Sequence, residues 1–453
     1  MKILFITPLI GIPKSEPPLG IMSMQAVLDQ AGYESKILDL YDNYDEARKV
    51  IKEYNPDVIG IACFTTYRMS SYKLAKIAKE VKPTVKVIMG GPHATFLWGQ
   101  IIKNIPEVDI ITMGESEHTF LEVVQHLDYK LGYSPLSEID GIVYRFDNNF
   151  YMTKPRKPIE NLDILPFPSY RDIDLKKYAI PCPPTFDSSE IKPSVSSSRG
   201  CFFNCTFCST KVFWGNWRAR SPKNVVDEIE WLYKKGIKYF NFSDDIFTTD
   251  QNRVIEICKE MIKRDIKMNW YCETRVNNIS FEMLKWMKQA GCYLIQFGVE
   301  SGSDYMLKNI NKMITTDQIK VAFKMAKDAG LQTEILLMVG NQGETWESIY
   351  ETERLLDELN PDIVIISITH IFPATKLYEL AKEKGIINDG FWLKDTPTIE
   401  YIGDHYVKTL MKMRLHIIKH YYKNKGRFAF YRYVIGQIRK NPKILWENIK
   451  GLI

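Results

Sequence analysis

Three cysteine residues lie close together in the stretch Ser198-Arg-Gly-Cys201-Phe-Phe-Asn-Cys205-Thr-Phe-Cys208-Ser209. Their C-x3-C-x2-C spacing places three thiols in one short loop, and thiolates are soft ligands that suit an iron–sulfur cluster or a zinc ion. Because the loop offers no obvious fourth ligand, one metal position is left open, and a substrate or cofactor can react there. A zinc site completed by a distant residue and a chance grouping of buried cysteines are the alternatives.

The elements that must position this loop follow it in the sequence. Apolar strand-like runs alternate with helical patterns. Five such strands follow the loop, and the strand that leads into Cys201 brings the number of β/α units to six. The predicted strands are 237–245, 267–275, 293–300, 332–340 and 363–370, and the predicted helices are 223–235, 253–264, 281–290, 316–329 and 345–359. Six units are too few for a closed eight-stranded barrel.

Polar and charged residues gather at the carboxyl ends of these predicted strands, where barrel enzymes carry their catalytic residues. They are Ser243, Asp244, Asp245, Glu273, Thr274, Arg275, Gln296, Glu300 and Ser301. Acids, an arginine and an amide are the partners required by a ligand that has both an ammonium and a carboxylate group. A structural ion pair near a strand end is the alternative for each residue.

The first 140 residues show a second strand–helix alternation. The predicted strands are 2–8, 34–40, 58–64, 86–91 and 110–115, and the predicted helices are 19–32, 46–54, 72–82, 96–105 and 118–127. Continuous apolar strands between helices predict a parallel sheet that is covered on both faces. Ligands of such sheets bind at the carboxyl ends of the strands. The residues there are Thr7, Pro8, Thr65, Thr66, Tyr67, Gly90, Gly91, Pro92, His93, Gly114, Glu115, Ser116 and Glu117.

The cysteine loop resembles the defining loop of the radical S-adenosylmethionine (SAM) family, C-x3-C-x-aromatic-C. The resemblance implies that Cys201, Cys205 and Cys208 hold a [4Fe–4S] cluster whose fourth iron is chelated by SAM, and that Phe207 packs beside the SAM adenine. It further implies an open (β/α)6 partial TIM barrel. In that barrel Ser243, Asp244 and Asp245 would meet the SAM amino group. Arg275 would face the SAM carboxylate, and Glu300 would bind the ribose hydroxyls, with Gln296 nearby.

The sequence Val-Ile-Met-Gly-Gly-Pro-His-Ala-Thr, followed by Asp109-Ile-Ile-Thr-Met-Gly-Glu-Ser-Glu-His-Thr, resembles the cobalamin-binding domain that precedes many radical SAM cores. The resemblance implies a Rossmann-like, doubly wound domain and cobalamin contacts from Thr7, Pro8, Thr65, Thr66, Tyr67, Gly90, Gly91, His93, Glu115 and Glu117. The Asp-x-His-x-x-Gly segment that ligates cobalt in other cobalamin domains is replaced by Pro8-Leu-Ile-Gly-Ile-Pro-Lys-Ser. The lower cobalt face is therefore expected to be open or weakly ligated.

Four segments are expected along the α/β chain. Asp140-Gly-Ile-Val-Tyr-Arg-Phe-Asp-Asn-Asn-Phe-Tyr-Met predicts a hairpin, and the prolines that follow predict an extended crossing segment. Cys182 lies there, outside the motif spacing, and is read as a non-ligand. The segments are a cobalamin-binding domain at 1–140, a linker with the hairpin at 141–190, the radical SAM core at 191–385 and a helical, basic extension at 386–453.

The last segment concentrates positive charge. Residues 407–453 contain twelve lysines and arginines and one acid, Glu447, whereas the rest of the chain has a net charge of −6. Basic residues beside aromatic and aliphatic ones suit an interfacial helix on anionic lipid, expected at 443–453. A nucleic-acid surface is a disfavoured alternative, and a solvated basic face packed on the core is the simplest interpretation.

The two resemblances together imply a cobalamin-dependent radical SAM methyltransferase that acts on an unactivated carbon through a 5′-deoxyadenosyl radical and methylcobalamin. A cyclase, oxidase or rearrangement enzyme without methyl transfer and a non-catalytic corrinoid sensor or carrier are the alternatives. A methylthiotransferase is disfavoured because the first domain has only Cys63. The expected partners are a small-molecule substrate, for which the basic tail suggests lipid solubility, and a reductant such as flavodoxin or ferredoxin. Scattered cysteines and the absence of a long apolar run lead us to expect a cytoplasmic or membrane-associated protein.

Overall fold

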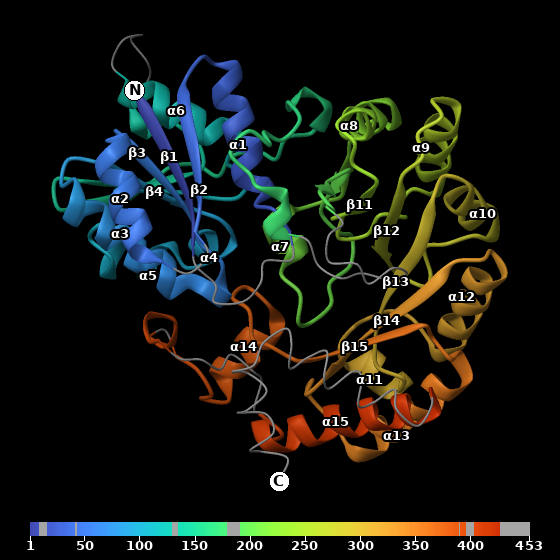
Figure 1. Cartoon of the computed structure of the whole chain (residues 1–453). Coiled ribbons are helices and arrows are strands. Elements are labelled where there is room, and N and C mark those ends of the chain that lie inside the picture. Colours follow the sequence, from blue (N-terminus) through green and yellow to red (C-terminus); the bar gives the residue numbers. More distant parts are fainter. Residues whose placement is uncertain are drawn as a thin grey trace.

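The computed structural model describes residues 1–8, 16–40, 43–128, 135–178, 191–388, 390–395 and 403–425. Its two large sheets belong to the two halves of the chain (Figure 1). The first sheet has the order β2-β1-β3-β4-β5-β6-β7, and the second has the order β15-β14-β13-β12-β11-β8. The predicted α/β fold class, with one doubly wound domain and one partial barrel, is therefore confirmed.

Five parallel strands form the first half: β1 (Lys2–Thr7), β2 (Glu34–Asp39), β3 (Val58–Ala62), β4 (Lys86–Gly90) and β5 (Ile110–Thr112). The order 2-1-3-4-5 reverses between β1 and β3, and ligands of doubly wound sheets bind at such a reversal. One face packs on α1 (Leu19–Gln30) and α6 (Glu117–Leu127). The other face packs on α2 (Tyr44–Tyr54), α3 (Arg68–Val81) and α5 (Trp98–Asn104).

Two local features of this half differ from the sequence-based expectation. The hairpin of β6 (Ile142–Phe146) and β7 (Asn149–Met152) pairs antiparallel with β5 and extends the sheet, although the sequence placed it in a linker. The helix expected at 96–105 is divided into α4 (Pro92–Phe96) and α5. It begins early because Gly91, at φ 99°, turns the chain and Pro92 suits the first helical position.

The second half is a curved sheet of six parallel strands, as predicted: β8 (Ser194–Val195), β11 (Tyr239–Phe242), β12 (Asn269–Thr274), β13 (Cys292–Glu300), β14 (Gln332–Val339) and β15 (Ile363–Ile368). Figure 1 shows helices α8 (Pro222–Lys234), α9 (Gln251–Lys263), α10 (Phe281–Gln289), α12 (Thr316–Asp328) and α13 (Trp346–Leu359) around its outer side. Their apolar faces and the outward strand residues form one buried cluster. The opposite, concave face is left for ligands.

Each of these five outer helices begins at a side-chain cap. The capping residues accept a hydrogen bond from the backbone N–H three positions later, and they are Ser221, Asp250, Ser280, Thr315 and Thr345. A cap satisfies a backbone donor that the first helical turn leaves unpaired. The caps therefore fix where each helix starts and, with it, the length of the loop that leaves the preceding strand.

Five shorter elements and one long helix complete the described strands and α-helices. They are β9 (Ser198–Arg199), β10 (Arg218–Ala219), α7 (Thr210–Trp214), α11 (Asp304–Asn309), α14 (Lys376–Glu383) and α15 (Val407–Asn424). Helix α15 buries Leu410, Met413 and Ile417 in the core cluster. The interfacial helix predicted at 443–453 lies outside the described residues, as does Cys182. Among the described helices, none is long and apolar enough to cross a membrane.

Candidate functional site

The three motif cysteines lie in the loop that joins β9 to α7. The backbone N–H of Phe203 donates to the Cys201 Sγ over 3.4 Å, and the N–H of Thr210 donates to the Cys208 Sγ over 3.5 Å. Cys201 and Cys205 are half-buried, whereas Cys208 is exposed. Desolvation of the sulfur atoms raises the pKa of the Cys201 and Cys208 thiols, so a bound cation must displace their protons.

Two adjacent aspartates at the end of β11 hold both sides of this loop. Asp244 accepts hydrogen bonds from the Ser197 N–H (2.7 Å), the Ser197 Oγ (2.6 Å) and the Ser198 Oγ (2.5 Å). Asp245 accepts from the Gly200 N–H over 3.3 Å and from the Thr210 Oγ1 over 3.1 Å. Both carboxylates thus support the loop backbone, and their contact with the SAM amino group stays a prediction.

Arg275, at the end of β12, lies against the same loop. Its Nη1 is 3.8 Å from the Cys205 Sγ, its guanidinium stacks 3.7 Å from the centre of the Phe203 ring, and its Nη2 donates to the Lys312 carbonyl. The residue is buried. The guanidinium therefore holds a positive charge beside the sulfur of a motif cysteine.

The predicted SAM residues Glu300 and Gln296 belong to a polar row on the concave face of the core. Glu300 adopts φ 74° at a bulge in β13, and its Oε1 accepts from the Lys312 Nζ over 2.7 Å. The Gln296 Nε2 donates to the Glu334 Oε1 on β14 over 3.0 Å. A left-handed conformation is costly for glutamate, and here the bulge and the contact with Lys312 hold the side chain in place.

Two carboxyl groups of this row have strongly shifted pKa values. Burial raises the pKa of Glu334 to about 7, although the hydrogen bond from Gln296 opposes the shift. Burial and the charge of Glu300 raise the pKa of Glu273 to about 7, against the effect of Lys312. The strand pairing places Glu273, Gln296 and Glu334 level with one another. The row can therefore hold or release protons near neutral pH.

Replacement of Glu334 by glutamine should flatten the pH dependence of stability. Native Glu334 keeps its proton to about pH 7, whereas the unfolded chain loses it near 4.5. Its stabilising contribution is thus present in full below about pH 4.5 and is lost as the pH rises through 7. We expect Glu334→Gln to raise the free energy of unfolding at pH 8 by up to about 3 kcal/mol and to change it little at pH 5.

Thermal unfolding of the metal-free protein between pH 5 and 8 measures this effect. Glu347→Gln, on the exposed side of α13, is the matched control because its carboxylate is 70% exposed beside Arg354. Parallel pH curves for wild type and Glu334→Gln would contradict a raised pKa at this position.

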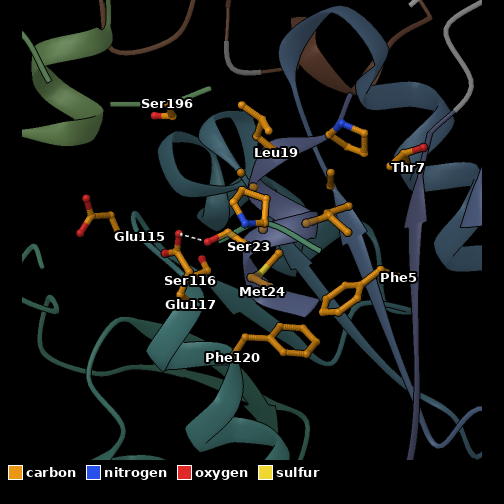
Figure 2. A pocket seen from close by; sticks show the side chains of 18 of the residues that line it. Phe5, Thr7, Leu19, Ser23, Met24, Glu115, Ser116, Glu117, Phe120 and Ser196 are labelled. Atoms are coloured by element: carbon orange, nitrogen blue, oxygen red, sulfur yellow. Dashed lines mark hydrogen bonds between the residues drawn. The ribbon is translucent and has the colours of Figure 1, made fainter. Parts of the chain in front are cut away.

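A cavity of about 670 Å³ opens between the first half of the chain and the core. Its wall includes Thr7, Tyr67 and Gly91 at the strand ends of the first sheet and Arg199 and Ser243 of the core. Its inner part enters the first domain between the sheet and helices α1 and α6. Figure 2 shows the side chains of Phe5, Met24 and Phe120 there. The cavity thus has an outer part between the two halves of the chain and an apolar inner part, the slot, within the first domain.

Seven of the ten residues predicted to contact cobalamin line this cavity: Thr7, Pro8, Tyr67, Gly90, Gly91, Glu115 and Glu117. Thr65, Thr66 and His93 do not. The two ring nitrogens of buried His93 lie 3.1 Å from the Thr65 Oγ1 and 3.0 Å from the Tyr72 Oη, and burial lowers its pKa to about 3. His93 is therefore a neutral core residue away from the cavity wall.

The donor groups fit the expected cofactors. Among the described residues, no three His, Cys, Asp or Glu side chains converge as ligands of a single metal ion would. An iron–sulfur cluster does not require the three thiolates to converge on one point, because each thiolate binds a different iron. None of the described residues that line the cavity is a histidine. Phe207 packs against the apolar cluster of Leu97 and Tyr378.

Four residues of the site were not singled out from the sequence. Arg199 and Arg218 bind the carboxylates of Glu115 and Glu117, and Lys312 and Glu334 complete the polar row. Arg199 directly precedes Gly200 and Cys201 of the motif, and this position is the one sequence signal that points to any of the four residues. The other three lie at positions whose neighbours in sequence carry no motif, so only the fold brings them to the site.

The chain matches two family models. The model described as the radical SAM superfamily covers residues 195–356, and the B12 binding domain model covers residues 9–124. The chain is 34% identical over 385 residues to an uncharacterized methyltransferase of Pyrococcus horikoshii, across 84% of this chain and 82% of the relative. It is 32% identical to the anaerobic magnesium-protoporphyrin IX monomethyl ester cyclase of Rubrivivax gelatinosus, across 85% of this chain and 70% of the cyclase.

A solved structure shows the same fold. The radical S-adenosylmethionine methyltransferase TsrM from Kitasatospora setae, with cobalamin and a [4Fe–4S] cluster bound, superposes with a TM-score of 0.70 at 16% identity. The match covers 85% of this chain and 75% of that one.

Proposed function

Because this chain belongs to the cobalamin-dependent radical SAM enzymes, we propose that it methylates an unactivated carbon of a small-molecule substrate. The observation that carries the proposal is the shared cavity. Its wall combines the strand ends of the B12 binding domain with Arg199, Ser196 and Ser243, which adjoin the cysteine loop. A methyl carrier in one domain and a radical source in the other would therefore face one common space.

The shape of the cavity suits a corrinoid, because its outer part can take the ring and the slot can take the appendage of the ring. Gly90 and Gly91 form part of its wall and pack tightly on the chain itself: a Cβ at Gly90 would lie 2.6 Å from the Thr112 Oγ1, and one at Gly91 would lie 2.9 Å from the Cys63 carbonyl oxygen. This part of the wall therefore requires glycine at both positions. The apolar slot beside Phe5 and Phe120 suits the nucleotide appendage of the corrinoid.

The motif cysteines would hold the cluster, and the concave face of the core would hold SAM. Once bound, the cluster supplies an electron to the SAM sulfonium and the corrinoid supplies a methyl group. Asp244 and Asp245 keep the loop in one conformation, and Arg275 keeps positive charge next to Cys205. Prolines 17, 18, 166 and 168 line the cavity and help to exclude water.

Two further features bear on the substrate and the electron donor. On the concave side, Leu336 and Met338 are partly exposed and Ile365 is 46% exposed, so this wall suits an apolar, lipid-soluble substrate. Exposed Cys208 gives a reductant such as flavodoxin or ferredoxin a short route to the cluster. Contact with a membrane surface through the basic tail remains a further proposal, supported by the composition of residues 407–453.

The main rival activity is a radical reaction without methyl transfer, because the relative in Rubrivivax gelatinosus is a cyclase. Anaerobic incubation with SAM that carries a deuterated methyl group separates the two. We expect a product whose mass increases by the labelled methyl group. A substrate that is consumed without gaining the label would support a cyclase, oxidase or rearrangement enzyme. A sensor or carrier would keep its function after the three cysteines are replaced by alanine.

A further inference from the structure

Two arginines stand at the base of the cysteine loop. Arg199 lies on β9, two residues before Cys201, and Arg218 lies on β10, which follows α7. The two strands pair antiparallel, and Arg199 and Arg218 are direct cross-strand partners. Because β9 enters the loop and β10 leaves the segment behind it, the two guanidiniums mark both ends of the cluster-binding region.

Both guanidiniums bind the turn between β5 and α6 of the B12 binding domain. The Arg199 Nη2 lies 2.6 Å from the Glu117 Oε1, and the Arg218 Nη2 lies 2.7 Å from the Glu115 Oε1. A third contact of 3.5 Å joins the Arg199 Nη1 to the Glu115 Oε1. We call Glu115, Glu117, Arg199 and Arg218 the Glu–Arg clamp.

The clamp is buried and has further hydrogen bonds. Its four side chains are between 6% and 14% exposed. Glu117 also accepts from the Ser23 Oγ, a bond drawn in Figure 2, and Arg218 donates to the carbonyls of Ile159 and Trp214. Burial alone would raise the pKa of Glu117, but the charge of Arg199 outweighs it and the pKa is lowered. Such short charged bonds away from water hold a defined geometry.

Glu115, Glu117 and Arg199 also form part of the cavity wall. The clamp is therefore both a part of the wall of the proposed corrinoid site and the start of the loop that carries the motif cysteines. We infer that the Glu–Arg clamp couples the two sites and that Arg199 is a positioning residue, which transmits occupation of the cavity to the cysteine loop. The inference rests on the proposed function in one respect, namely that the cavity takes a corrinoid.

Hydrogen exchange of the full chain with its cluster reconstituted under anaerobic conditions tests the coupling. The readout is the exchange rate of backbone amides in residues 198–210, with and without hydroxocobalamin. In wild type we expect hydroxocobalamin to slow this segment by about tenfold. In Glu117→Gln, which loses the charge that holds Arg199, the slowing should fall below about twofold at a hydroxocobalamin concentration that saturates the variant, as followed by the absorption spectrum.

Glu122→Gln is the matched control, because Glu122 lies on the same helix and pairs with Arg156, which is not part of the clamp. It should behave as wild type. Arg199→Lys keeps the charge but loses the two-pronged contact, and should give an intermediate slowing; it replaces Glu117→Gln if that variant does not fold. Equal slowing of the loop in wild type, Glu117→Gln and Arg199→Lys would overturn the inference.

Failure of the proposed function would look different. If wild type binds no hydroxocobalamin, the corrinoid assignment fails, and the clamp is then tested without ligand. In that case residues 198–210 should exchange about tenfold faster in Glu117→Gln than in Glu122→Gln. Equal rates in these two proteins would show that the clamp does not position the loop.

Discussion

Replacement of Cys201, Cys205 and Cys208 together by alanine is expected to leave a folded protein that binds no iron and forms no 5′-deoxyadenosine from SAM. The three thiols lie at the surface of the core in a loop whose shape depends on Asp244 and Asp245, so their loss removes ligands and no core packing. We expect the rate of SAM cleavage to fall by more than about a hundredfold, beyond the usual effect of losing an outer-sphere partner. Iron analysis and chromatography of the products measure both quantities.

Cys258→Ala is the control for this experiment. Cys258 is a free cysteine that is fully buried in the core cluster, away from the loop. Cys258→Ala should lower the free energy of unfolding slightly, because it leaves a small cavity in the core. It should leave the iron content unchanged. Retention of iron and of SAM cleavage in the triple variant would show that the motif is inert.

Gly20→Trp is expected to block the corrinoid and to spare the cluster. Gly20 lies in α1 at the cavity wall, and a Cβ there would meet no atom within 4 Å. An indole can therefore enter the cavity without displacing the chain, and a residue other than glycine also suits a helix. We expect the cobalt retained per chain to fall at least about tenfold, whereas SAM cleavage should change by less than about twofold.

Gly99→Trp provides the matched comparison. Gly99 is also a helical glycine, in α5, with open space around its Cβ position, and it does not line the main cavity. It should retain cobalt like wild type. Equal cobalt content in Gly20→Trp and Gly99→Trp would mean that the corrinoid binds elsewhere or not at all.

The local features of the site could be predicted from the sequence, whereas the contacts between its parts could not. The cysteine spacing, the strand–helix repeats and the capped helix starts are all encoded within short segments. The resemblance to a cobalamin-binding domain implies that Glu115 and Glu117, which follow a strand, contact cobalamin. In the structure they are bound by Arg199, 82 residues from Glu117, and by Arg218, 103 residues from Glu115. Which carboxylates these arginines bind depends on how the two domains pack together. The periodicity of the sequence carries no information about that packing.

Smaller discrepancies have the same origin. His93 follows the glycine pair that forms the cavity wall, but the turn at Gly91 directs it toward Thr65 and Tyr72 in the core. The hairpin around Asp147 and Asn148 was recognised from its turn residues, both of which adopt positive φ. Its pairing with β5 was missed, because antiparallel pairing beyond a loop leaves no local pattern.

The most direct test of the central claim is metal and product analysis of the protein after anaerobic reconstitution with iron, sulfide and hydroxocobalamin. The proposed function predicts about four irons and about one cobalt per chain, together with 5′-deoxyadenosine formed from SAM and a reductant. Zinc at the cysteine loop, or no 5′-deoxyadenosine under these conditions, would contradict it.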